Sequence, residues 1–416
     1  MTSNQVEWVL SSFYISYIIF EWLTFLWKVI PAHIFLSGLV LSWGIIASLQ
    51  SITTSYPFLI VLRVLLGIGE AGFTGIPFYL SFFYKRGELA LRTGLFISAA
   101  PLATSFASSL ASGIVLLANY TPISAWRLLF LIEGFPSIIV AVIAFNVIPD
   151  SPSTAHYLTR REKKIARLRL RKENHPASPQ SGGLKRNEML ATLTDPKAYL
   201  TAFMFFFANM AFSSMPVFLP TIVHEMGHSI LISQALCAPP FLLAFFVVIT
   251  TAYLSDRWAS RGYVIIFHAL LSCLGYAIMA ISGYLNLSPW YRYAGVYPAC
   301  VGFFSVITII ITWNINNQES ESKQGMGFAM MQIIGQCGPI VGTRLYPDSD
   351  APLYIHGSVG CAVAMAVVAL LAGGLRWYLG RLNRIGKREH EEIAKEEEEG
   401  FVRGGKRREV MFRYLL

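Results

Sequence analysis

Two ionisable residues seven positions apart, Arg63 and Glu70, lie inside an otherwise apolar stretch of the sequence. Such residues are costly in lipid and usually face a helix-bundle interior or an aqueous cavity. On one helix they would share a face, about 10 Å apart along the axis. A guanidinium can bind a carboxylate through two parallel hydrogen bonds, and burial favours a protonated carboxyl group. The spacing therefore predicts anion recognition by Arg63 and proton exchange by Glu70; an ion pair between helices, or an arginine reaching the membrane surface, is the structural alternative.

Further polar or amphipathic residues lie within other apolar stretches. The hydroxyl of Tyr17 could donate a hydrogen bond to a carboxylate, or the ring could simply pack against neighbouring helices. The second-half residues could line a cavity, but polar side chains also hold membrane helices together, and for each one taken singly we favour packing. These second-half residues are Asn209, Trp313, Gln332 and Gln336.

Charged residues also mark the ends of two apolar stretches. Glu21 lies near the end of the first stretch, where it could act as a gate, take part in coupling or pair with Lys28. Asp256 and Arg257, followed by Arg261, place an acid and two bases at a short turn. This second group suits a gate between helices, although an ordinary charged surface turn would look the same.

The elements that must position these residues are eleven long apolar stretches, each close to the ~20 residues that cross a bilayer. Lipid offers no hydrogen-bond partners, so every crossing segment must satisfy its backbone within a helix. We therefore expect an all-α membrane protein. The predicted spans are 7–27, 34–54, 58–83, 93–118, 126–148, 198–222, 231–254, 264–284, 291–313, 325–345 and 354–379.

Lysine and arginine gather in alternate loops, and the positive-inside rule assigns those loops to the cytoplasm. The long basic linker of residues 150–197 and the tail of residues 381–416 belong to this set. Five spans then form an N-terminal bundle, residues 1–149, and six form a C-terminal bundle, residues 198–380. Two bundles joined by one long cytoplasmic loop are typical of transporters, which hold their substrate between the bundles.

The composition favours the same class of protein. Hydrophobic residues make up 54% of the chain and charged residues 14%, against about 25% in soluble domains. The net charge of +9 is explained by cytoplasmic loops, so we expect no nucleic-acid partner. The five cysteines lie inside predicted spans without paired spacing. His224-Glu225-Met226-Gly227-His228 matches a zinc-protease pattern, but it falls in a short loop with a glycine between the ligands, so we expect no metal and no cofactor.

Several short runs, in their order and spacing, resemble the major facilitator superfamily. Within it the chain is similar to the anion:cation symporter family, especially its fungal allantoate and nicotinate permease-like members. The runs are Phe13-Tyr14-Ile15-Ser16-Tyr17 with Glu21, Ser42-Trp43-Gly44, Leu62-Arg63-Val64-Leu65-Leu66-Gly67 with Glu70-Ala71-Gly72, Trp126-Arg127 with Glu133-Gly134, Pro149-Asp150-Ser151-Pro152, Phe218-Leu219-Pro220, Leu254-Ser255-Asp256-Arg257 and Asp350-Ala351-Pro352-Leu353-Tyr354.

This resemblance implies a two-bundle transporter, with Arg63 recognising an anion, Glu70 carrying the proton and Tyr17 facing the substrate. It also implies that the acid–base cluster at Asp256 locks the cytoplasmic side. The chain departs from the family pattern in one respect: by this resemblance we expect that it lacks the family's first helix. We therefore expect a groove open to lipid beside the spans 7–27 and 58–83, and weak transport or none by the 416-residue chain alone.

The sequence thus predicts a secondary active transporter, not an enzyme, that takes up a small organic anion together with protons. Allantoate, nicotinate and pantothenate-like carboxylates are all compatible. A substrate-sensing receptor on a transporter fold and an inactive truncated gene product remain as alternatives. We expect a multi-pass protein of the plasma membrane, its C-terminus cytoplasmic, working as a monomer.

Overall fold

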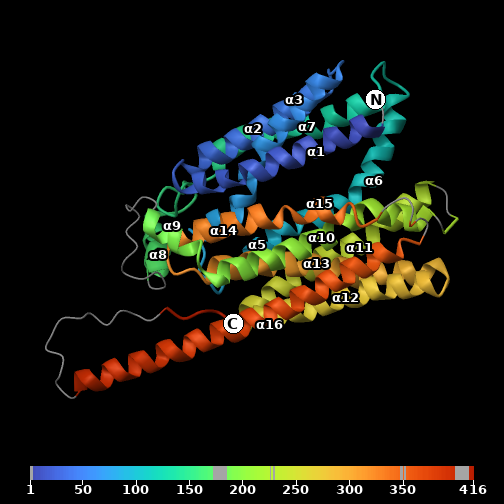
Figure 1. The fold of residues 1–416 in the computed structure, drawn as a ribbon. Helices are drawn as coiled ribbons and strands as arrows, with labels where there is room; N and C mark the ends of the chain where they lie inside the picture. Colours follow the sequence, from blue (N-terminus) through green and yellow to red (C-terminus); the bar gives the residue numbers. More distant parts are fainter. Residues whose placement is uncertain are drawn as a thin grey trace.

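The computed structural model is helical over most of its length and describes residues 3–171, 185–224, 226–227, 230–346, 350, 353–398 and 412–416. No β-strand occurs within these ranges. The helices pack as two groups, which occupy separate layers in Figure 1. The all-α expectation is confirmed.

The first group comes from the N-terminal third of the chain. α1 packs against α3, and α2 packs against both α3 and α7. Gly67 permits the close approach of α1 and α3, because a Cβ there would lie 2.2 Å from Ser16 Oγ and 2.6 Å from the Phe13 carbonyl oxygen. The members are α1 (Ser3–Phe20), the 3-10 helix η1 (Glu21–Lys28), α2 (Ala32–Gln50), α3 (Tyr56–Ala71) and α7 (Ala125–Val147).

The second group surrounds one central helix, α13, which packs against α10, α11 and α12. The α12–α13 contact is close because Gly302 has no side chain: a Cβ there would lie 2.4 Å from Ser272 Cβ. The members are α10 (Pro196–His224), α11 (Ile230–Arg257), α12 (Gly262–Tyr284), α13 (Pro289–Asn316), α14 (Glu321–Gly335), α15 (Gly338–Gly342) and α16 (Ile355–Glu398).

Short elements connect α3 to the second group. The 3-10 helix η2 (Gly72–Gly75) and α4 (Ile76–Leu80) follow α3 directly. α5 (Leu89–Ile97) and α6 (Ala99–Ala118) then pack mainly against α11, and α6 also touches α7. The chain segment with α5 and α6 is therefore a main contact between the two groups (Figure 1).

Two helices of the basic linker lie at one end of the molecule, which we name the linker end (Figure 1). They are α8 (Arg160–Arg171) and α9 (Arg186–Thr192). Thr159 and Glu162 cap α8 reciprocally, because Thr159 N donates to Glu162 Oε2 at 2.8 Å and Glu162 N donates to Thr159 Oγ1 at 3.3 Å. α9 packs against α14.

The count of eleven spans is not confirmed. Within the described ranges, nine helices are long and apolar enough to cross a membrane. The two predicted spans outside this set, 7–27 and 325–345, both contain a break in the helix. α1 passes into η1 at Glu21, and α14 ends at Gly335 before α15 begins. A break alone does not exclude a span, because the counted spans Tyr56–Leu80 and Leu89–Ala107 also contain one.

Candidate functional site

A partly open cavity of about 250 Å³ lies in the first group, lined by Tyr17, Trp43, Glu70 and Phe73. Glu70 is one residue from the end of α3, and Tyr17 lies in the facing helix α1. Trp43 and Phe73 form an aromatic wall, with ring centroids 4.8 Å apart in an edge-to-face arrangement. The structure therefore brings together two of the residues that the sequence singled out, a carboxyl group and a phenol, against an apolar surface.

Arg63 lies on the same helix as Glu70, two turns earlier, and is half-buried. Its guanidinium lies over the ring of Phe130 in α7, 5.5 Å from the centroid. Its Nε is buried without a hydrogen-bond partner, and among the described residues Arg63 forms no ion pair. An interhelical ion pair is therefore not the role of Arg63 in this structure, and its donors remain able to bind an anion.

Glu21 is fully buried at the start of η1. Thr74 Oγ1 donates a hydrogen bond to its Oε2 at 2.9 Å, while Oε1 has no partner among the described residues. A pairing with Lys28, one of the roles considered for Glu21, is wrong, because Lys28 Nζ contacts Glu321 Oε2 of α14 at 2.9 Å. The Glu21 carboxyl group is thus bound by Thr74, whereas Lys28 forms an ion pair with the second group.

None of the second-half candidates lines this cavity. Asn209 is buried between α10 and α14, and its Nδ2 donates to the Gly335 carbonyl at 3.4 Å. Gln332 is buried in α14 with Oε1 unpaired in the described chain, and Gln336 is half-buried at the end of that helix. Trp313 is fully buried, and its Nε1 donates to the Leu415 carbonyl at 2.7 Å. The hydrogen bonds of Asn209 and Trp313 therefore go to residues that do not line the cavity.

Comparison with known proteins decides the family. The model of the Major Facilitator Superfamily matches residues 1–343. The chain belongs to the major facilitator superfamily. It is 31% identical over 399 residues to the MFS transporter prlL of Fungal sp. (strain NRRL 50135), covering 92% of this chain and 78% of the relative. It is therefore a transporter and an integral multi-pass membrane protein, and it is not an enzyme.

Solved structures share the fold of this superfamily member. The proton:xylose symporter XylE aligns with a TM-score of 0.67 at 14% identity, covering 89% of this chain and 86% of XylE. The E. coli fucose:proton symporter FucP aligns with a TM-score of 0.63 at 17% identity, covering 90% of this chain and 91% of FucP. At these identities the likeness establishes the two-bundle fold alone.

The charged turn between α11 and α12 of the transporter contacts the start of α5 at the linker end. The Asp256 carboxylate accepts hydrogen bonds from Ala90 N at 3.3 Å and Leu91 N at 2.7 Å, at the start of α5. A helix N-terminus favours an anion, so this contact is well placed electrostatically. Arg261 Nη2 lies 2.5 Å from Asp256 Oδ1. Asp256 therefore joins the second group to α5.

Arg261 extends this contact, while Arg257 does not. The Arg261 side chain is fully buried, and its Nη2 also donates to the Arg86 carbonyl at 3.0 Å. Burial lowers the pKa of Arg261, and the nearby charge of Asp256 opposes that shift. Arg257 is exposed and forms no ion pair within the described ranges. Of the residues expected at this gate, Asp256 and Arg261 are brought together.

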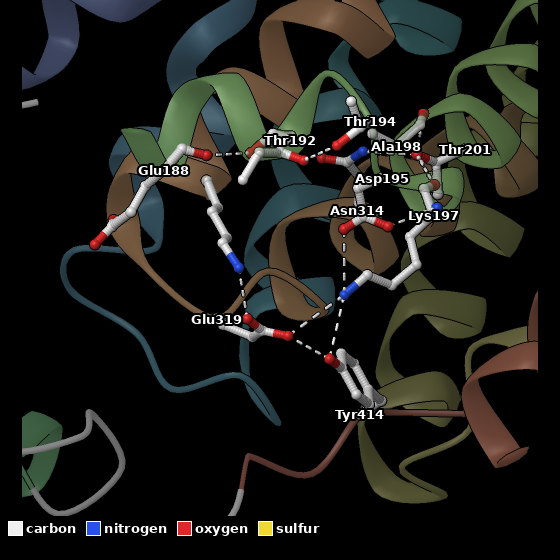
Figure 2. Close-up of polar contacts among 12 residues, drawn as sticks. Glu188, Thr192, Thr194, Asp195, Lys197, Ala198, Thr201, Asn314, Glu319 and Tyr414 are labelled. Atoms are coloured by element: carbon white, nitrogen blue, oxygen red, sulfur yellow. Dashed lines mark hydrogen bonds and ion pairs between the residues drawn. The ribbon is translucent and has the colours of Figure 1, made fainter. Parts of the chain in front are cut away.

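A second polar cluster at the linker end escaped the sequence analysis (Figure 2). Lys197 Nζ lies 3.4 Å from Asp195 Oδ2 and 3.6 Å from Glu319 Oε1. Burial raises the pKa of Glu319, but hydrogen bonds from Lys323 and Tyr414 and the charges of both lysines outweigh it and lower this pKa to about 2. The cluster joins three distant parts of the chain, at Asp195 and Lys197, at Glu319 and Lys323, and at Tyr414, so no local spacing could have revealed it.

Metal binding finds no support in the described part of the chain, which contains no group of three or more candidate ligands. In the zinc-protease-like run, Glu225 and His228 lie outside the described residues. Trp43 and Phe73 are the cavity residues that sequence reasoning did not assign. Trp43 belongs to a run that carried the family resemblance, and that was the one available signal.

Proposed function

We propose that the protein is a proton-coupled symporter of a small organic anion, such as a carboxylate vitamin or an allantoate-like nitrogen source. The observation that carries the proposal is the combination on α3 of an unpaired, half-buried guanidinium and a carboxyl group that lines a cavity. Ionisable groups at such positions in membrane helices mark substrate and proton pathways. XylE and FucP, which share the fold, are proton symporters, and this is consistent with the proposed chemistry.

In this proposal Arg63 binds the substrate carboxylate and Tyr17 donates a hydrogen bond to it. Glu70 is protonated from the outside and releases its proton to the cytoplasm. Asn209, Trp313, Gln332 and Gln336 are the candidates from the second bundle for further substrate contacts. The contacts of Asn209 and Trp313 described above favour packing and docking roles for those two.

The gate of the proposed transporter comprises Asp256, Arg257, Arg261 and Glu21. Asp256 and Arg261 carry the contact between bundles, which supports their part of the assignment. The exposed Arg257 would contribute through long-range charge alone. Opening of the linker end requires that the hydrogen bonds from Ala90 and Leu91 to Asp256 break.

The remaining proposals concern membrane topology and cellular location. We propose eleven crossings, five before the linker of residues 150–197 and six after it, with α1–η1 and α14–α15 as broken spans. The bundles would comprise residues 1–149 and 198–380, with residues 381–416 as a tail. The linker and tail would face the cytoplasm of a plasma-membrane protein of the anion:cation symporter family, acting as a monomer.

Uptake of labelled carboxylates by the purified protein in liposomes tests the proposal. A panel of allantoate, nicotinate and pantothenate, with a neutral sugar as control, identifies the substrate class. Arg63→Ala should abolish carboxylate uptake, and Arg63→Lys should restore little of it because an ammonium lacks the planar two-donor fork. Arg92→Ala, which removes an arginine held over the ring of Tyr84, is the matched control.

Uptake by Arg63→Ala at the unmodified rate would contradict the assignment of Arg63. Transport of the neutral sugar but of no carboxylate would contradict the substrate class. Accumulation against a gradient, which needs coupling, is separated from simple exchange by imposing or omitting a pH difference across the membrane.

A further inference from the structure

Residues 412–416 form a segment without helix, and they bind at the linker end to the second group and to the loop before α5. Most of their partners are distant in sequence, with separations of up to 327 residues. The segment ends beside α16, where Figure 1 marks the C-terminus. The partners that bind it are Arg86, Lys197, Arg261, Trp313, Asn317 and Asn383.

Two asparagines each form two hydrogen bonds to the backbone of one residue of the segment. Asn383 Oδ1 accepts from Tyr414 N at 2.9 Å, and its Nδ2 donates to the Tyr414 carbonyl at 3.0 Å. Asn317 does the same for Leu415, at 2.8 Å and 3.0 Å. Such paired contacts satisfy the segment's backbone as a neighbouring strand would, which is how proteins bind extended peptides.

Further backbone contacts extend this arrangement. Trp313 Nε1 donates to the Leu415 carbonyl at 2.7 Å, and Arg261 N donates to the Leu416 carbonyl at 2.7 Å. Trp313 is fully buried in the central helix α13, so its indole is held rigidly. The binding surface therefore includes a buried indole and a backbone amide of the fold.

The side chain of Tyr414 provides specificity. Its hydroxyl donates to Glu319 and accepts from Lys197 Nζ at 3.2 Å (Figure 2). The same Nζ lies 4.3 Å from the centroid of the ring, within range of a cation–π attraction. A tyrosine at this position thus makes hydroxyl, ring and backbone contacts at once.

The segment also reaches the first half of the chain. Arg86, in the loop between α4 and α5, donates from Nη1 to the Arg413 carbonyl at 3.0 Å, and its guanidinium lies 4.4 Å from the centroid of the Phe412 ring. The Arg86 carbonyl accepts hydrogen bonds from Arg261 and from Asn316, each at 3.0 Å. Arg86 therefore connects the segment to the same junction that Asp256 closes.

We propose that residues 412–416 are an internal peptide ligand that holds the linker end closed and must be released before the two bundles separate there. The inference rests on the proposed transport function, in which the two ends open alternately. A ligand bound to the closed state shifts the equilibrium toward it by its differential affinity. Loss of the segment should therefore favour the state open at the linker end.

Hydrogen–deuterium exchange on the purified full chain in nanodiscs tests this proposal directly. The Arg261 amide, which donates to Leu416, reports docking. The Ala90 and Leu91 amides, which donate to Asp256, report closure. We compare the intact protein with a variant lacking residues 412–416 and with Tyr414→Ala, which retains every backbone group.

Both variants should speed exchange at Arg261 and at Ala90 and Leu91 by about tenfold or more, because the docked segment no longer protects these amides. Arg413→Ala is the matched control, since the Arg413 side chain is exposed and the contact uses the carbonyl alone. It should leave all three rates unchanged.

Faster exchange at Arg261 with unchanged Ala90 and Leu91 would overturn the proposal, because the segment would bind without controlling closure. Unchanged exchange at Arg261 in both variants would overturn the docking itself. If the deletion also speeds exchange throughout α13, the fold has been damaged and Tyr414→Ala decides the question. The measurement needs no substrate, so a failure of the transport proposal would leave its result readable.

Discussion

The two halves of the molecule differ in how completely their helices bury one another. In the most apolar eighteen-residue window of each span, 22% to 39% of residues are buried before the linker and 39% to 83% after it. Buried polar atoms do not follow this difference. Tyr276 donates to the Ala211 carbonyl and Ser272 to the Ala299 carbonyl, deep in the second half. Among the described residues, Arg63 and Glu21 in the first half keep buried atoms without partners, and so do Gln332 and Ser305 in the second.

The difference in packing indicates that the two halves have different roles. The second half is built around one central helix, α13. The first half holds Tyr17 and Glu70 at a cavity, and Arg63 lies two turns from Glu70 on the same helix without an ion pair in the described part of the chain. The closer packing of the second half favours a supporting role for it and the chemistry in the first.

The junction between the halves should give the largest effect. Asp256→Ala leaves Arg261 buried without its partner, and breaking a buried ion pair in this way costs about 3–5 kcal/mol. The loss of stability is measured by heating the protein in detergent and determining the remaining folded fraction by size-exclusion chromatography. Arg257→Ala, one residue along and exposed, should change the unfolding free energy by less than about 0.5 kcal/mol. Equal effects of the two substitutions would contradict a closure built on Asp256.

Glycine substitutions sharpen the comparison within each half. A Cβ at Gly302 in α13 would lie 2.4 Å from Ser272 Cβ and 2.5 Å from the His268 carbonyl oxygen. Gly302→Ala should therefore destabilise the protein by about 1–3 kcal/mol, the usual cost of overpacking. A Cβ at Gly113 in α6 would have no atom within 4 Å. Gly113→Ala should instead be neutral or stabilising by up to about 1 kcal/mol through helix propensity.

The smallest effect concerns pH at the linker end. The pKa of Glu319 is lowered from 4.5 to about 2, so its ionised form is the one that the folded protein favours. Its contribution to stability is fully present above the unfolded pKa and is lost as pH falls through about 2. Exchange at the Arg261 amide, corrected for intrinsic rates, should therefore show constant docking from pH 6 to pH 8. Release of the segment near neutral pH would contradict this prediction.

Charge and hydropathy patterns predicted the helical class, the two halves and the long linker, because lipid imposes one backbone solution on every crossing segment. They also singled out Arg63 and Glu70, since ionisable residues stand out against apolar neighbours. They could not predict that Trp313 binds Leu415, because that contact joins residues 102 positions apart. The breaks at Glu21 and Gly335 were missed because hydropathy is insensitive to helix geometry.

The most direct test of the central claim is proton-driven uptake in liposomes by Glu70→Gln. Glutamine keeps the size and polarity of the protonated acid but cannot lose a proton. We predict that an imposed pH gradient will no longer concentrate carboxylate, while exchange of labelled for unlabelled substrate continues. Concentrative uptake by the glutamine variant at the rate of the unmodified protein would show that Glu70 is not the proton carrier.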